Sequence, residues 1–173
     1  MKLPSFLLGI GMLCSVALQG QTLSTVTLEK ENHRVAAVVP SVANLCAMLE
    51  METEKLATTL KSFGYVELQE QEGFRRFSNG TEQFPSYTQG LHMLLLDMEM
   101  PEVKYVTSLN LHVLGLAVDA LKEELRGGYL GDLRDNDGYQ IEVFALKRRS
   151  VTYEVYITNR PMYFEVAILR TSP

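Results

Sequence analysis

Two stretches of the chain follow one pattern, and this repetition limits the folds that the chain can adopt. They are "GYVELQEQEGFRRF", residues 64–77, and "GYLGDLRDNDGYQIEVF", residues 128–144. In each stretch Gly-Tyr follows a helical pattern. Further along, an acidic residue, a glycine and an aromatic residue stand in succession. Glycine between two β-prone runs favours a hairpin. The chain is therefore expected to use the same helix-to-hairpin unit twice.

The segments around the two hairpins extend the match. Apolar residues recur at helical spacing in residues 42–63 and again in residues 114–125, ahead of each Gly-Tyr. Two further β-prone runs follow each hairpin, and a proline, Pro101 or Pro161, separates them. The expected strands span residues 65–70, 74–78, 90–99, 102–111, 129–134, 139–147, 151–158 and 162–170.

Capping residues predict where the helices begin and end. Ser41 and Thr53 each precede apolar residues at helical spacing, so we expect two short helices with a tight joint between them. Gly64 is placed to end the second of these helices. Gly127 and Gly128 are placed to end the later helix in the same way.

We expect an α+β fold with two tandem repeats, each a helical segment plus a four-stranded antiparallel sheet. One helix over four short strands buries a single sheet face, so the repeats are expected to share a core or a continuous sheet. The lead-in should have a mobile, polar start and one strand near residues 35–39. The predicted divisions are a signal peptide at 1–20, a lead-in segment at 21–40, a first repeat at 41–112 and a second repeat at 113–173.

The first 20 residues have the features of a secretory signal peptide. Lys2 precedes an apolar run from Phe6 to Leu18, and small residues at Ala17 and Gly20 come before a polar segment. We expect cleavage after Gly20, or alternatively after Ala17, and a soluble exported protein in the periplasm or outside the cell. An unprocessed N-terminal anchor is the other interpretation, but the apolar run is shorter than a comfortable membrane span.

The predicted order of elements resembles the β-lactamase inhibitor protein fold, in which a helix-loop-helix and a four-stranded antiparallel sheet occur twice in tandem. It is also similar to the two-fold saddle of the TATA-binding protein type. The resemblance covers residues 41–170 and rests on element order and on the Gly-Tyr and proline positions. A net charge of −5 offers no basic field for nucleic acid. No family motif matches residue by residue, so the resemblance implies a fold and no activity.

The aspartate-rich segment at residues 131–139 resembles either a calcium loop or a tight turn. With Gly138 at the sixth position of an EF-hand loop, Leu133 would be the first ligand and Phe144 the twelfth. Neither side chain can bind calcium. Asp137-Gly138 instead predicts a type I′ turn, in which both central residues have positive φ. We therefore expect a hairpin here and no metal or cofactor site.

Other patterns that could carry chemistry are weak. His33, His92 and His112 lack the paired spacing of a zinc-binding helix. On one strand, His92 would point away from Asp97 and Glu99, which disfavours a local catalytic cluster.

A lone cysteine and a basic run have ordinary structural interpretations. Cys46 lies among apolar residues of a predicted helix and is expected to be a small buried hydrophobe. The basic residues at 147–149 are expected to form the solvated end of a hairpin, with an anion site as the alternative.

The two repeats differ most in the run just before each proline. If Pro101 is aligned with Pro161, residues 91, 93 and 95 match residues 151, 153 and 155, which are apolar in both copies and suit a helix-packed face. The opposite face carries both polar and aromatic side chains in the second copy, and several large apolar side chains in the first. The candidate binding residues are His92, Leu94, Leu96, Met98 and Met100 in the first copy and Tyr156 in the second.

Two interpretations of this apolar strand remain open. It is either covered on both faces, or it exposes an apolar surface for a protein, a peptide or an apolar small molecule. The second interpretation makes the chain an exported, non-enzymatic binding protein with no membrane span and no nucleic-acid partner. The alternatives are an envelope enzyme whose site assembles from distant residues, with His92, His112 and Asp97 as first candidates, or a purely structural envelope component.

Overall fold

The computed structural model describes residues 22–30, 33–71, 74–79, 92–97, 102–108, 112–161 and 163–171. The first part contains β1 (Thr25–Lys30), β2 (His33–Val38), α1 (Val42–Glu50), α2 (Thr53–Ser62), β3 (Val66–Gln71), β4 (Phe74–Asn79), β5 (His92–Asp97) and β6 (Glu102–Ser108). The second part contains α3 (His112–Leu125), a 3-10 turn (Arg126–Gly128), β7 (Tyr129–Arg134), β8 (Gln140–Arg148), β9 (Val151–Asn159) and β10 (Tyr163–Arg170). These elements match the predicted helices and sheet strands closely.

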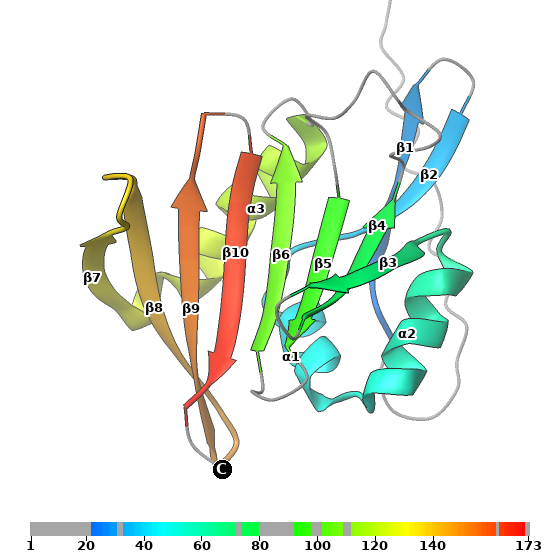
Figure 1. Ribbon diagram of the computed structural model, residues 1–173. Coiled ribbons are helices and arrows are strands. Elements are labelled where there is room, and N and C mark those ends of the chain that lie inside the picture. Colours follow the sequence, from blue (N-terminus) through cyan, green and yellow to red (C-terminus); the bar gives the residue numbers. More distant parts are fainter. Residues whose placement is uncertain are drawn as a thin grey trace, which may run out of the picture.

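Eight of the strands form one antiparallel sheet in the order β3-β4-β5-β6-β10-β9-β8-β7 (Figure 1). The strands run outward from β6 to β3 on one side and from β10 to β7 on the other. β6 and β10 pair with each other at the centre, from Glu102–Leu169 to Ser108–Tyr163. The predicted α+β class is therefore confirmed, and the sheet is continuous.

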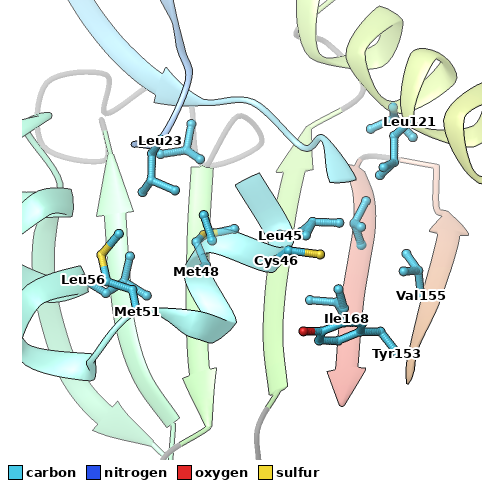
Figure 2. Close-up of a cluster of buried hydrophobic side chains, with 14 of the residues drawn as sticks. Leu23, Leu45, Cys46, Met48, Met51, Leu56, Leu121, Tyr153, Val155 and Ile168 are labelled. Carbon is cyan, nitrogen blue, oxygen red and sulfur yellow. The ribbon is translucent and has the colours of Figure 1, made fainter. Parts of the chain in front are cut away.

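The described helices lie on one face of the sheet. Figure 1 views the sheet from the other face, with α1 and α3 behind the strands, and Figure 2 views the helix side. One apolar core fills the space between these layers, and burying each large apolar side chain there contributes roughly 1.5–3 kcal/mol. Its fully buried members include Leu45, Cys46, Leu60, Val118, Leu121, Phe77, Val155, Val166 and Ile168.

Local signals in the sequence fix the start of α1 and the end of α2 as expected. By contrast, α2 starts without a side-chain cap, and neither Gly127 nor Gly128 after α3 has positive φ. The Ser41 hydroxyl accepts a hydrogen bond from the Asn44 amide at 3.2 Å and caps α1. After α2, Gly64 adopts φ +87°, the Gly64 amide donates to the Lys61 carbonyl, and the Tyr65 amide donates to the Leu60 carbonyl. This is the Schellman pattern, which needs a left-handed residue just past the helix.

The lead-in segment differs from the prediction, because it forms a two-stranded hairpin rather than one strand after a mobile start. β1 pairs with β2 in an antiparallel sheet of their own. The buried Asn44 side chain joins this hairpin to α1: its Oδ1 accepts from the Ser24 amide at 2.8 Å, and its Nδ2 donates to the carbonyls of Ser24 and Val39. The sequence did not predict that Asn44 joins the hairpin to α1, because it is a single polar residue in an apolar helical stretch.

The hairpin between β7 and β8 is confirmed, but the predicted type I′ turn is wrong. Gly138 has φ +86°, whereas Asp137 is not among the described residues with positive φ. The Gly138 amide donates to the Asp135 carbonyl, and the Asp135 amide donates to the Tyr139 carbonyl, both at 3.0 Å. This is a three-residue loop with glycine in the left-handed position. Asp135 Oδ1 accepts from the amides of Asp137 and Tyr139, which favours this geometry over type I′.

The expected signal peptide at residues 1–20 lies outside the described residues and stays a prediction. Among the helices that are described, none has the length and apolar character needed to cross a membrane.

Candidate functional site

The face of the sheet that carries no described helix is the candidate site. In β9, Tyr153, Val155 and Ile157 point into the core, so strand alternation places the residues between them on the other face. The pairings of β9 with β8 and β10 extend that face over both neighbours. We call it the open face; its described residues on β8, β9 and β10 are Ile141, Val143, Ala145, Lys147, Thr152, Glu154, Tyr156, Thr158, Glu165, Ala167 and Leu169.

The centre of the open face is apolar, and its margins carry polar and charged residues. Tyr156 lies opposite Val143 on β8 and opposite Ala167 on β10, and both of these partners are buried. The larger apolar side chains of Ile141 and Leu169 are half-buried, like Tyr156. Aliphatic and aromatic carbon therefore makes up the middle of this surface.

The polar groups of the open face already contact groups of the same chain. The Tyr156 hydroxyl donates a hydrogen bond to Glu154 Oε2. Glu165 lies 3.7 Å from the guanidinium of Arg160, which is itself 2.7 Å from Asp135. The Arg160 guanidinium also stacks over the Tyr139 ring at 5.0 Å. This network fastens the aspartate-rich turn to the rim of the open face.

Of the predicted binding residues, the structure places Tyr156 on the open face, and His92, Leu94 and Leu96 lie in β5. Met98 and Met100 lie outside the described residues. The prediction that these residues bind a partner stays a prediction.

The strand register reverses the face that we expected for the β5 residues. Leu94 is the cross-strand partner of Phe77, which is fully buried in the core. Alternation then gives Leu94 and Leu96 the register of the helix-covered face, and gives Met93 and Leu95 the register of the open face. Aligning Pro101 with Pro161 offsets the two copies by 60 residues, an even number. The observed strand pairing instead matches residues of the two copies that are an odd number of positions apart. Both sets of positions are apolar, so the apolar character of the strand does not depend on the correction.

Cys46 does not offer a reactive thiol. It is fully buried against the sheet, as predicted (Figure 2). Burial raises the pKa of the thiol, although a hydrogen bond with Arg148 acts in the opposite direction. A raised thiol pKa keeps the thiolate scarce, and the thiolate is the nucleophile and the metal ligand. The basic hairpin end at residues 147–149 is exposed, also as predicted.

The aspartate-rich turn has a structural role. Asp135 Oδ1 accepts two backbone amides, and Oδ2 lies against Arg160. Within the part of the chain that the structure describes, no group of three His, Cys, Asp or Glu side chains is arranged to hold a metal ion.

Sequence reasoning missed the contribution of Ile141 and Leu169 to the open face. Both belong to alternating runs that were recognised as strands. Only the order of the strands brings them to the same face as Tyr156, opposite Thr158 and Glu154, and that order is not visible in a single run of residues.

Comparison with known proteins supplies no relative from which a function could be taken. No family model matches the chain, and neither a curated protein nor a solved structure matches it.

Proposed function

We propose that this chain is an exported, non-enzymatic binding protein that engages a protein partner or an apolar ligand through the open face. The observation that carries the proposal is the one-sided arrangement of the described helices on a continuous eight-stranded sheet. That arrangement leaves the surface over β8, β9 and β10, with its apolar centre around Tyr156, without a described helix. Apolar surfaces of this kind on a folded chain are typical of interaction sites.

The chemistry of the open face suits binding without catalysis. Tyrosine is enriched at the centres of interfaces because it offers a large rigid surface and one polar group. Tyr156 lies at the centre of the open face, and its hydroxyl is already hydrogen-bonded to Glu154. Binding an apolar partner would therefore leave the phenol with a hydrogen-bond partner and limit the cost of desolvation.

The alternative of an envelope enzyme has less support. Two of its candidate residues, His92 and Asp97, lie at opposite ends of β5 and pair with Asn79 and Phe74 on β4. Five residues along a strand separate two groups by roughly 16 Å, which is too far for a direct proton transfer.

We also propose that residues 41–112 and 113–173 are two copies of one unit. The outward order of strands on each side of the β6–β10 pair supports this, as does the helical segment ahead of each set of four strands. The check is an experimentally determined structure in which β3–β6 superpose on β7–β10 strand for strand. Different connections in the two halves would contradict the duplication.

Export is tested by expressing the full chain in a host with a secretion pathway and measuring the mass of the product in each fraction. The proposal expects a periplasmic or secreted protein that begins at Gln21, or at Leu18 if Ala17 ends the signal. An intact chain held in the membrane fraction would contradict it.

The binding function is tested with a variant that places two cations on the open face, Ile141→Lys/Leu169→Lys. The matched control is Leu116→Lys on α3, because Leu116 is 56 % exposed but lies on a helix outside the open face. Each protein is immobilised, exposed to the native envelope fraction and analysed by mass spectrometry for bound proteins and small molecules. We expect the wild type and the control to retain the same partner and the open-face variant to lose it.

Circular dichroism melting curves show whether the open-face variant is folded. Equal recovery of the partner by all three folded proteins would exclude the open face as the site.

A further inference from the structure

We propose that two copies of this chain pair edge to edge through β7, in an antiparallel arrangement centred on Leu133. β7 is the last strand of the sheet and pairs with β8 on one side only. Its leucines are conspicuously accessible, with Leu130 62 % exposed and Leu133 54 % exposed. An exposed edge of this kind is a template for pairing with another strand.

One part of the β7 edge is protected against such pairing, and another part is not. The register with β8 shifts between Tyr129 and Gly131, where Gly131 has φ +137°, and a bulge of this kind bends an edge away from an incoming strand. After the bulge, residues 132–134 pair regularly with residues 142–140 of β8. The flat part of the edge is therefore Asp132-Leu133-Arg134, with the exposed leucine at its centre.

The backbone of this segment has the orientation that pairing requires. The Asp135 amide donates to the Tyr139 carbonyl across the hairpin, so it points toward β8. Peptide groups alternate along an antiparallel strand, so those of Asp132 and Arg134 point away from β8, toward the open edge. An antiparallel copy centred on Leu133 places Asp132 opposite Arg134 of the second copy as a hydrogen-bonded pair, and Leu133 opposite its counterpart as a non-hydrogen-bonded pair.

The same register is complementary in charge. A two-fold axis at Leu133 brings the Asp132 carboxylate of each copy opposite the Arg134 guanidinium of the other. Opposite charges at directly facing positions stabilise a sheet, and like charges destabilise it. The self-pairing register is thus the one in which both charged residues of the flat edge are matched.

Contacts within each copy hold these two side chains in place. Asp132 accepts hydrogen bonds from the Tyr129 hydroxyl at 2.7 Å and from the side-chain Nε2 of Gln140 at 2.6 Å. Arg134 donates from Nη1 to the Gly138 carbonyl at 2.8 Å. A guanidinium has further donors, and a carboxylate has further lone pairs, so both groups can also form the contact between copies.

The opposite edge of the sheet lacks this complementarity. β3, "VELQEQ", carries Glu67 and Glu70 and no basic residue, so self-pairing would bring carboxylates together. Val66 on that edge is 54 % exposed, the same as Leu133, and is therefore a matched control position.

A charge exchange tests the proposed pairing by sedimentation equilibrium of the purified chain. We expect the wild type to form dimers, and we expect Asp132→Arg and Arg134→Asp each to raise the dimer dissociation constant by about tenfold or more, because like charges then face each other. The double variant Asp132→Arg/Arg134→Asp should return to the wild-type constant, and Val66→Glu should leave it unchanged. A wild type that stays monomeric, or single variants that dimerise like the wild type, would overturn the proposal.

A cysteine pair supplies a second measurement that does not depend on the charges. Facing Cα atoms of a non-hydrogen-bonded antiparallel pair lie about 4.5 Å apart, which is within the range of a disulfide. Leu133→Cys should therefore give covalent dimers on mild oxidation, and Val66→Cys under the same conditions should not. Equal cross-linking at both positions would show collision rather than specific pairing and would overturn the proposed register.

Discussion

The two Gly-Tyr junctions have the same residues and different physical reasons for them. At the first, Gly64 adopts φ +87° with open space where a Cβ would lie, and Tyr65 is 3 % exposed. At the second, Gly128 has no positive φ, but a Cβ would lie 1.9 Å from the Ala145 carbonyl oxygen, and Tyr129 is 49 % exposed. The glycine of Gly-Tyr thus ends a helix in the first half, and in the second half it lets two backbone segments approach closely.

The tyrosines of the two junctions differ in the same way. The Tyr65 oxygen accepts a hydrogen bond from the buried Val38 amide and so helps to join β2 to the main body. The Tyr129 hydroxyl donates to Asp132, and its ring lies 5.5 Å from that of Phe144 at the margin of the sheet. The first junction is part of the interior, whereas the second is part of a surface that a partner can reach.

The largest difference between the junctions is expected for alanine at Gly128. Gly128→Ala forces a methyl group into the Ala145 backbone, so we expect a loss of at least about 3 kcal/mol of stability in urea unfolding. The neighbouring Gly127→Ala is the control, because nothing lies within 4 Å of its Cβ position, and it should change stability by less than about 0.5 kcal/mol. Equal stability of the two variants would show that no such contact exists.

Removing one hydroxyl from each junction should separate the two tyrosines. Tyr65→Phe leaves the buried Val38 amide without its partner, and we expect it to cost about 1–3 kcal/mol. Tyr129→Phe removes a hydrogen bond at an exposed position and should cost much less stability than Tyr65→Phe. Urea unfolding of both variants measures the difference, and a larger loss for Tyr129→Phe would reverse our comparison.

Alanine at Gly64 should have a moderate effect. Its Cβ meets no atom within 4 Å, so the cost comes only from holding a non-glycine residue at φ +87°. We expect a loss of about 1 kcal/mol in thermal or urea unfolding. Gly64→Asn should recover part of that loss, because asparagine tolerates the left-handed region better. A neutral Gly64→Ala variant would contradict the backbone strain at this helix end.

The smallest expected effect is on the titration of Tyr129. Its hydrogen bond to Asp132, followed by burial and the negative charges nearby, raises the pKa of the phenol. The protonated phenol of Tyr129 therefore stabilises the folded chain fully at a pH below the ordinary tyrosine pKa. This stabilisation is lost as the pH rises through the pKa that the phenol has in the folded chain. Tyrosine ring NMR resonances, assigned with Tyr129→Phe, should show a lower pKa for Tyr129 in Asp132→Asn. An unchanged value would mean that Asp132 does not perturb the phenol.

Element type and extent could be predicted from the sequence, because each depends on residues within one segment. Gly64 marked the end of α2, and alternation marked the strands. The face taken by the β5 residues could not be predicted, because it depends on whether a loop adds an odd or an even number of residues. Leu94 opposite Phe77 shows that parity only once the strands are paired.

Two polar side chains account for the other differences from prediction. Asn44 lies in an apolar helical stretch, yet its amide bonds to Ser24 and Val39 and orders the lead-in hairpin. Asp135 supplies an acceptor to its own turn and selects a three-residue loop where Asp137-Gly138 favoured a two-residue turn. In both cases a side chain forms hydrogen bonds with backbone groups of other residues, and the propensities of single residues do not include such bonds.

The pairing of β6 with β10 determines the order in which this sheet can be assembled. The other described pairs in the large sheet join strands that follow each other in the chain, so they close short loops and form early. β6 and β10 are separated by the whole of α3 and β7–β9, so their contact carries a larger entropy cost and forms late. During synthesis from the N-terminus, β3–β6 can be complete while β6 still has an unpaired edge. The completion of β10 is then the step that covers the β6 edge of the growing chain.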